Sequence, residues 1–307
     1  MKAMRIHSFG TSDVLRWEDV SVPSPGPGEV LVKVFAAGVN PVDYKIRSGN
    51  FRRDLSLPLT LGREVSGVIE AVGPEVAGFP RGQEVYGMLA KYSGGYAEFA
   101  RALAREIAPK PKSLDHIHAA AVPLAATTAW QGLFDHGQLR KGERVLILGA
   151  AGGGGHFAVQ FARHAGARVI ATARSVDLEF VHELGADDVI DYQTQRFEDE
   201  VSEIDLVLDL VAGESQDRAW RVLRRHGRLV SALGQPAENS GARSRGIAAI
   251  GFMADPRTEQ LAEIGELIDD REVTVVVERI LPLPMAAKAQ DELEQEHIRG
   301  KMVLVAD

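Results

Sequence analysis

The sequence predicts an α/β protein in which a β-rich part precedes a doubly wound parallel sheet. Its 307 residues suit two moderate domains better than one core. Short strand patterns separated by turns fill the first hundred residues, and from about Asp115 strands alternate with longer helices. A run of glycines stands between one of these later strands and the helix that follows it.

Composition and charge exclude several classes of protein. Hydrophobic residues make up 45% of the chain and charged residues 25%, as is usual for globular proteins. The formal net charge is −8 and Lys and Arg are scattered, so we expect no nucleic acid partner. We interpret the basic run 221–228 as the solvated end of a helix. We expect no membrane partner, because glycines and polar residues interrupt the longest apolar run, 145–162.

The chain contains no cysteine. Disulfides, thiolate nucleophiles and cysteine-based metal sites are therefore excluded. Residues 1–10 lack the apolar stretch and small-residue cleavage site of a signal peptide. We expect a cytoplasmic location.

The chain divides by pattern into three stretches: 1–117, 118–256 and 257–307. For the first, the apolar and turn patterns predict strands at 1–7, 22–28, 29–38, 67–72 and 84–88. For the second, they predict helices at 118–132, 156–164, 178–184 and 215–223, and strands at 144–148, 168–173, 188–191, 204–210, 228–233 and 247–252. The segment 241–246 is expected to be a loop. The last stretch, with helices at 258–269 and 284–294 and strands at 273–280 and 301–305, is expected to rejoin the first domain.

The glycine run follows an apolar strand and precedes an apolar helix, which is the setting of a dinucleotide-binding turn. Glycine permits a tight turn and close approach of the backbone to a pyrophosphate, and the helix N-terminus offers N–H groups to it. We therefore predict a Rossmann-type domain. The cofactor contacts come from Gly149, Gly152, Gly153 and Gly154.

The end of the next strand, Ala173-Arg174-Ser175, indicates which dinucleotide binds. A carboxylate usual for NAD is missing there, whereas Arg174 can pair with a 2′-phosphate and Ser175 can donate to it. We expect the cofactor NADPH. Tyr192 is a second candidate at the adenosine end. The alternatives are that Arg174 points into solvent and that Tyr192 is a surface tyrosine.

Several segments together resemble the zinc-independent quinone oxidoreductases of the medium-chain dehydrogenase/reductase superfamily. The resemblance runs through almost the whole chain. It rests on 38–45 (GVNPVDYK), 61–68 (LGREVSGV), 94–98 (GGYAE), 122–129 (VPLAATTA), the glycine turn, the 185–192 passage and the final RGK at 299–301.

This resemblance implies a GroES-like β-rich domain interrupted by the Rossmann domain, with the active site in the cleft between them. The first and last stretches would then form the catalytic domain, and 118–256 the NADPH-binding domain. It also implies that Asn40 lies near the nicotinamide ribose and Thr127 near the nicotinamide or its phosphate. The nicotinamide half would be lined by Val211, Leu233, Gly234 and Phe252.

The catalytic candidates in the cleft are Asn40, Asp43 and Lys45. Each has an alternative reading. Asn40 is equally well explained as an amide that caps the turn before Pro41, and Asp43 and Lys45 could simply pair with each other.

The sequence departs from the zinc enzymes of the superfamily, which carry cysteine near Asn40 and Gly-His-Glu near Gly62. Here Asn40 and Arg63 stand at those ligand positions, so we expect no metal. His116 and His118 are interpreted as surface histidines. Without a Lewis acid, hydride delivery to an electrophile activated by conjugation remains.

We therefore expect an NADPH-dependent reductase whose partner is a small-molecule quinone or enone. One alternative is an enoyl-thioester reductase, but Phe51 stands where that group carries its catalytic tyrosine, and Tyr44, Tyr92 and Tyr96 lie elsewhere. The other alternative is a non-catalytic NADPH-binding protein. A homodimer is expected because the apolar strand 247–252 would otherwise be an unprotected sheet edge.

Overall fold

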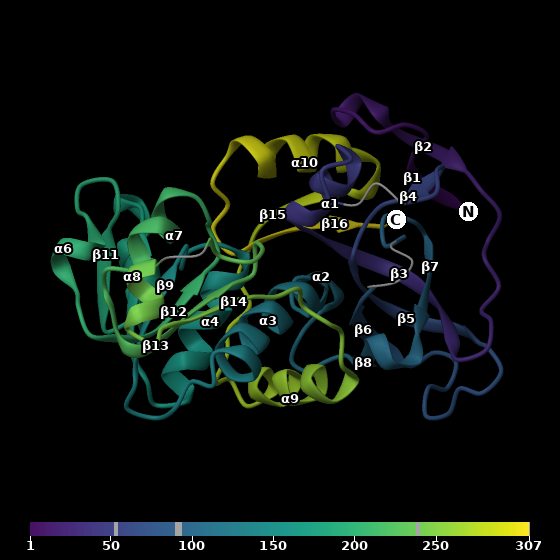
Figure 1. Cartoon of the computed structure of the whole chain (residues 1–307). Coiled ribbons are helices and arrows are strands. Elements are labelled where there is room, and N and C mark those ends of the chain that lie inside the picture. The colour runs from purple at the N-terminus through teal and green to yellow at the C-terminus, as the bar shows by residue number, and fades with distance from the viewer. Residues whose placement is uncertain (52–54, 90–93, 238–239, 307) are drawn as a thin grey trace. The chain divides into compact units, whose positions relative to one another are not determined.

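The computed structural model describes residues 1–51, 55–89, 94–237 and 240–306 (Figure 1). These fall into two compact units. Unit 1 comprises residues 1–124, 255–271 and 275–307, and unit 2 comprises 125–254 and 272–274. No helix of the described residues is long and apolar enough to cross a membrane.

Unit 1 is built on two sheets. The smaller has the strand order β2-β1-β4, and the larger the order β15-β16-β3-β5-β6-β8, with β7 also paired to β3. The strands are β1 Lys2–Ile6, β2 Leu15–Asp19, β3 Glu29–Val39, β4 Leu59–Thr60, β5 Glu64–Val72, β6 Glu84–Met88, β7 Phe99–Leu103, β8 Ile107–Pro109, β15 Val277–Pro282 and β16 Lys301–Val305.

The tail of the chain belongs to this unit because β16 pairs antiparallel with β3, with Met302 opposite Val39. Four helices accompany the strands: α1 Pro41–Arg47, α2 His116–Ala120, α9 Thr258–Asp269 and α10 Ala286–Gln295. Single 3₁₀ turns lie at Ser12–Val14, Ala104–Glu106 and Leu283–Met285.

Unit 2 contains a six-stranded sheet of order β11-β10-β9-β12-β13-β14, in which every pair of neighbours is parallel. This is the order of a dinucleotide-binding doubly wound sheet, as the sequence predicts. Its strands are β9 Arg144–Leu148, β10 Arg168–Ala173, β11 Asp188–Asp191, β12 Ile204–Asp209, β13 Leu223–Ser231 and β14 Ala248–Gly251. Its helices are α3 Pro123–Trp130, which begins in unit 1, the π-helix η3 Gln131–His136, α4 Gly153–His164, the 3₁₀ turn Ser175–Asp177, α5 Leu178–Glu183, α6 Phe197–Glu200, α7 Glu214–Ala219 and α8 Ser240–Ser244.

Five element predictions are wrong. No strand forms at 22–28, because its prolines lack N–H donors. The strand that follows β1 is instead β2, which the sequence does not predict. The single helix expected at 118–132 is split between α2 and α3. Residues 273–276 lie outside β15, and the loop expected at 241–246 includes part of α8.

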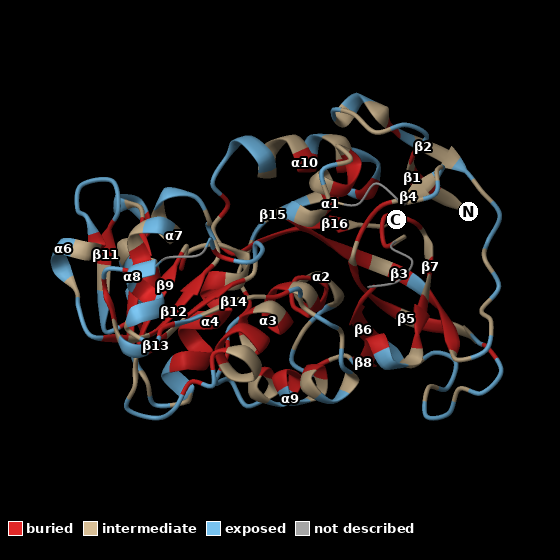
Figure 2. Ribbon diagram, in the orientation of Figure 1, coloured by how far each residue is buried: buried red, intermediate tan, exposed pale blue. Residues whose placement is uncertain are grey.

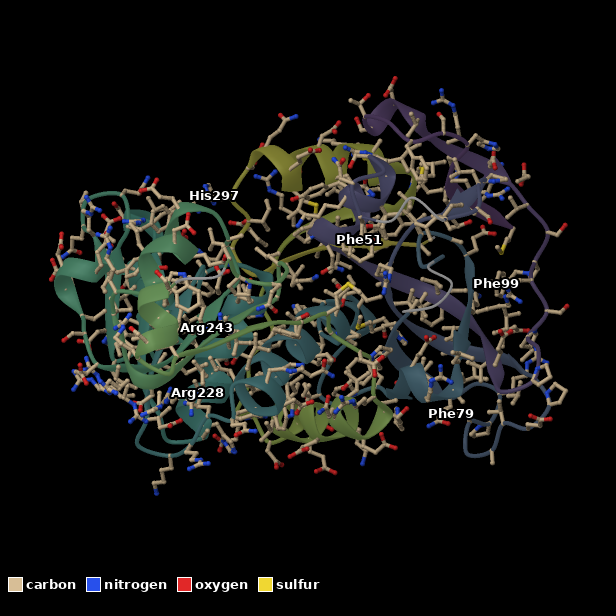
Figure 3. All side chains as sticks on the ribbon, viewed as in Figure 1. Phe51, Phe79, Phe99, Arg228, Arg243 and His297 are labelled. Carbon is tan, nitrogen blue, oxygen red and sulfur yellow. The ribbon has the colours of Figure 1, made fainter. Side chains whose placement is uncertain are left out.

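The fifth concerns the basic run 221–228, which is the start of strand β13 and not the end of a helix. Two of its arginines pair with acids of neighbouring segments. Arg224 pairs with Asp205, and Arg228 lies 2.7 Å from Glu143 (Figure 3). Cross-strand ion pairs therefore stabilise a segment that reads as solvated in the sequence.

Many residues of the strands in both units are buried (Figure 2), and their apolar side chains form the cores. In unit 2, Leu146, Leu148, Ile170 and Val207 are buried in one cluster. Strands in the middle of a parallel sheet are covered on both faces, which explains their continuous apolar runs.

A short segment of the tail is held by unit 2. The side-chain amide of Gln160 on α4 donates to the Thr274 carbonyl at 3.0 Å, and the Thr274 N–H donates to Gln160 Oε1 at 2.7 Å. One side chain therefore replaces a strand partner for residue 274.

Candidate functional site

The glycine turn connects β9 to α4 in unit 2. Gly149 has φ +84°, a conformation that favours glycine. A Cβ on Gly155 would lie 2.1 Å from the Gly149 carbonyl oxygen, so the turn and the helix approach too closely for any side chain there. Gly155 is the last glycine of the predicted turn, although it is not among the predicted cofactor contacts. The turn leads directly into the N-terminus of a twelve-residue helix, which suits an anionic group.

Apart from Thr127, the predicted cofactor residues of unit 2 follow the ends of its six strands. Because the strands are parallel, these residues lie along one edge of the sheet. Gly149 follows β9, Arg174 and Ser175 follow β10, Tyr192 follows β11, Val211 follows β12, Leu233 and Gly234 follow β13, and Phe252 follows β14.

Arg174 does not simply point into solvent. Its guanidinium lies 2.7 Å from Asp177, whose carboxylate is buried. The Ser175 hydroxyl donates to Asp191 Oδ2 at 2.5 Å, and this hydrogen bond lowers the pKa of Asp191. Tyr192 is exposed, as a surface tyrosine or a ligand contact would be.

The ends of β12 and β13 expose Val211 and Leu233, which are 51% and 42% accessible. Gly234 has φ +119°. A buried carboxylate that the sequence analysis missed, Asp209, orders this region. Its Oδ1 accepts from the N–H groups of Val211 and Ala212 at 3.0 and 2.9 Å, and its Oδ2 accepts from Ser231 Oγ at 2.8 Å. An aspartate that ends an apolar strand and precedes a glycine-containing turn is a signal that could have identified it.

Thr127 and Phe252 are both buried within unit 2. Thr127 lies on α3. The ring of Phe252 stacks against His136 with centroids 4.7 Å apart, and its Cζ would be 3.2 Å from a Cβ on Gly132. Packing inside the unit therefore accounts for most of the surface of Phe252.

In unit 1, the side chain of Asn40 is fixed by charged partners at the end of β3. Its Nδ2 donates to Glu64 Oε1 at 2.7 Å, and its Oδ1 accepts from the Lys301 ammonium at 2.5 Å. The amide does not cap α1. Instead, the carboxylate of Asp43 accepts from the backbone N–H of Asn40 at 2.9 Å.

Lys301 and Glu64 contact the candidate residue Asn40, and sequence reasoning missed both, although both stand within motifs. Lys301 is 3% exposed and Glu64 is fully buried, and their charged atoms are 2.6 Å apart. The second carboxylate oxygen of Glu64 accepts from the Leu124 N–H at 2.7 Å. A charged residue at the first position of an apolar strand, as in Glu64-Val65 and Lys301-Met302, is the available signal.

Asp43 is fully buried and pairs with Tyr96 rather than with Lys45. The Tyr96 hydroxyl donates to Asp43 Oδ2 at 2.9 Å. Burial raises the pKa of Asp43 to about 6, and burial together with the Asp43 charge raises the pKa of Tyr96 well above its usual value. Lys45 is half-buried on α1.

Phe51 lies beside α1 and packs against the core of unit 1, so no phenol stands there (Figure 3). Tyr44 is half-buried on α1. Tyr92 lies outside the described residues. Tyr96 is fully buried, and its hydroxyl donates to Asp43.

Arg63, which stands at a ligand position of the zinc enzymes, and the two histidines at 116 and 118 have partners within the protein. Arg63 Nε donates to the Leu89 carbonyl at 2.7 Å. His118 is half-buried, and its Nδ1 lies 2.8 Å from Asp115 Oδ1. His116 is not a surface histidine: its Nδ1 lies 2.8 Å from Ser66 Oγ and its ring packs edge-on against Phe35. Among the described residues, no three His, Cys, Asp or Glu side chains are grouped as a metal site requires.

Comparisons with known proteins agree with this architecture. The alcohol dehydrogenase GroES-like domain matches residues 26–112, and the family described as zinc-binding dehydrogenase matches residues 184–304. The chain is 33% identical to a quinone oxidoreductase of Rattus norvegicus, over 99% of this chain and 98% of the relative. It is 34% identical to an NADPH-dependent alkenal/one oxidoreductase, chloroplastic, of Arabidopsis thaliana, over 99% and 79% of the two chains.

Among solved structures, the quinone oxidoreductase of Escherichia coli complexed with NADPH superimposes with a TM-score of 0.89 at 26% identity, covering 99% of this chain and 100% of that one. The sheet order, the glycine turn and these full-length similarities lead to one conclusion. The chain belongs to the quinone oxidoreductase-like family of the medium-chain dehydrogenase/reductase superfamily.

Proposed function

We propose that this protein is an NADPH-dependent reductase that transfers hydride to quinones or activated enones. The observation that carries the proposal is the glycine turn at the start of α4, at a sheet edge where all six strands end in predicted cofactor residues. Relatives named as quinone and alkenal/one oxidoreductases support the substrate class. On this proposal unit 2 is the cofactor domain and unit 1 the catalytic domain.

The residues of unit 2 fit a dinucleotide. The missing side chains at Gly149 and Gly155 allow the backbone to approach a pyrophosphate, and α4 presents its N–H groups to that charge. Arg174, Ser175 and Tyr192 would contact the adenosine end. Thr127, Val211, Leu233, Gly234 and Phe252 would bound the nicotinamide half, and Asn40 would orient its ribose. Bound NADPH supplies the hydride.

We propose that the reaction needs no zinc. At the position where zinc enzymes of the superfamily have a ligand, the Asn40 side chain contacts the buried ammonium of Lys301 at 2.5 Å. A metal cation beside that ammonium would be repelled in a medium of low polarity. The positive charge that a zinc ion would bring to this position is therefore already supplied by Lys301.

The catalytic contribution of the chain is positioning. Lys301 and Glu64 fix both ends of the Asn40 amide, so the amide has one orientation. Asp43 holds the Asn40 backbone and the Tyr96 hydroxyl. We assign Asp43 to support of this segment, and we propose that the reduced quinone takes its protons from water.

The test is a fluorescence titration with NADPH and NADH, followed by an absorbance assay of NADPH oxidation with 1,4-benzoquinone and a simple enone. Oxidation driven by either acceptor is expected, and the better acceptor would narrow the substrate class. NADPH binding without turnover of any acceptor would contradict the reductase proposal and favour a non-catalytic binding protein. Reduction of an enoyl thioester alone would favour the enoyl-thioester reductases.

We also propose a homodimer. Strand β14 is the outer strand of its sheet and is partly exposed. Because the Gln235 side chain already bonds the Ala249 carbonyl and the Gly251 N–H, a second copy of the chain would pack against the exposed side chains of this strand. A single monomer peak in gel filtration would contradict this. For the location we propose the cytoplasm, although the Arabidopsis thaliana relative is named chloroplastic. Immunolocalisation or fractionation would test it.

A further inference from the structure

At the adenosine end of the proposed cofactor site, a carboxylate already occupies one of the predicted phosphate donors. Asp191 ends β11 and is the register partner of Ala173, the last residue of β10. Its Oδ2 accepts from the Ser175 hydroxyl at 2.5 Å. Asp191 is therefore one strand away from Arg174, at the same edge of the sheet.

The contact with Ser175 goes beyond what the local turn requires. Asp191 Oδ1 accepts from the Gln193 N–H at 3.0 Å, and Oδ2 accepts from Thr194 Oγ1 at 3.0 Å. These two bonds order the turn after β11. The bond to Ser175 reaches across to the segment that follows the neighbouring strand, and it lowers the pKa of Asp191.

Arg174 has a partner of its own. Its guanidinium lies 2.7 Å from the buried carboxylate of Asp177. One cation and two carboxylates therefore stand at this edge, so the local formal charge is negative before a phosphate arrives. A 2′-phosphate would gain Arg174 but meet the charge of Asp191, whereas the 2′-hydroxyl of NADH could donate to a carboxylate.

We propose that Asp191 is a specificity-determining residue that limits the preference for NADPH over NADH, by holding the Ser175 hydroxyl and placing a negative charge beside the 2′ position. This inference rests on the proposed cofactor site. It adds that the preference is set by a residue of β11 as well as by Arg174 on β10. The chain accordingly accepts both cofactors.

The experiment compares the dissociation constants of NADPH and NADH for the full-length protein and for Asp191→Asn. The variant is expected to bind NADPH about tenfold more tightly, equivalent to roughly 1.4 kcal/mol, with NADH affinity changed less than about threefold. Asp188→Asn is the matched control. Asp188 is on the same strand and pairs with Arg168 at 3.0 Å near its other end, so the ratio of the two constants should not change.

Melting curves identify a variant that fails to fold, and Asp191→Ser, which keeps an acceptor for its neighbours, then replaces Asp191→Asn. An unchanged ratio in a folded Asp191 variant would overturn the inference. So would a wild-type preference for NADPH above about a hundredfold, or roughly 2.7 kcal/mol. If neither cofactor bound the wild-type protein, the proposed function itself would fail, which is a different result from binding of both with an unmoved ratio.

Discussion

The ammonium of Lys301 lies 2.6 Å from Glu64 Oε1 in the interior of unit 1, although the two residues are 237 positions apart in the chain. Three segments meet there, since Asn40 contacts both charges. Buried ion pairs of this kind add little net stability as a pair, but losing one partner leaves the other charge uncompensated.

Lys301→Met should therefore destabilise the protein by about 3–5 kcal/mol in urea unfolding. The matched control is Lys288→Met, which removes an exposed lysine that lies 3.6 Å from Glu292, and about 1 kcal/mol or less is expected from it. Adding Glu64→Gln to Lys301→Met should recover part of the loss, because the uncompensated charge is then gone. Equal losses in the two lysine variants would contradict a role for the buried pair.

Asp43 should give the protein a measurable pH dependence. Burial raises the pKa of Asp43 from 3.8 to about 6, so the folded state binds this proton more tightly than the unfolded chain. The stabilisation that comes from binding this proton on Asp43 is fully present below about pH 4 and is lost as the pH rises to about 6. Asp43→Asn cannot titrate, so it should gain roughly 3 kcal/mol relative to wild type across this window.

The measurement is urea unfolding of both proteins at several pH values between 4 and 7. The control is Asp19→Asn. The hydrogen bond from Lys2 lowers the pKa of Asp19, so its contribution to stability is lost only below about pH 4 and the difference between wild type and Asp19→Asn should stay constant across this range. A constant difference between wild type and Asp43→Asn would show that Asp43 titrates normally.

Two glycines of the same turn should respond differently to alanine. A Cβ on Gly155 would lie 2.1 Å from the Gly149 carbonyl oxygen, whereas one on Gly152 would lie 3.6 Å from it, an ordinary contact. Gly155→Ala should destabilise the fold by about 1–3 kcal/mol through overpacking. Gly152→Ala should fold with a change within about 0.5 kcal/mol but bind NADPH more weakly, because on the proposed function its added methyl group takes up space in the turn that receives the pyrophosphate. Thermal melts and cofactor titrations separate the two effects, and equal melting temperatures would refute the expected clash.

Asp209→Ala should impair cofactor binding without any contact to the cofactor. The carboxylate accepts the hydrogen bonds that order the turns leading to Val211 and Leu233. Its loss leaves buried donors unsatisfied, at a cost of about 1–3 kcal/mol. Asp217→Ala, which removes an exposed aspartate from α7, should change stability by less than about 0.5 kcal/mol. An unchanged dissociation constant for NADPH in Asp209→Ala would contradict this prediction.

The order of unit 2 could be predicted from the sequence because its signals are local. A strand such as β9, the glycine turn and α4 are consecutive, and each has its own pattern. The start of strand β13 is not predicted correctly, because Arg224 and Arg228 are typical of a solvent-exposed segment in the sequence. Their acidic partners lie on other segments, so only the structure shows these ion pairs.

The polar network of unit 1 could not be predicted in the same way. Glu64 and Lys301 come into contact only after β16 has paired with β3, and the sequence around each residue does not predict the register of that pairing. Similarly, the sequence suggests Ser175 as a hydrogen-bond donor to the phosphate, but it does not show that Asp191 accepts the hydrogen bond of this hydroxyl. Side-chain partners across strands depend on tertiary pairing, which local periodicity does not encode.

The bond pair between Gln160 and Thr274 sets a condition for engineering with this protein. A chimaera that receives only residues 125–254 from this chain would bring Gln160 without the backbone it clamps. The host's own tail would then have to offer an N–H and a carbonyl at the same place. Grafting experiments should therefore transfer residues 272–274 together with residues 125–254, because the two separate stretches of sequence form one structural unit.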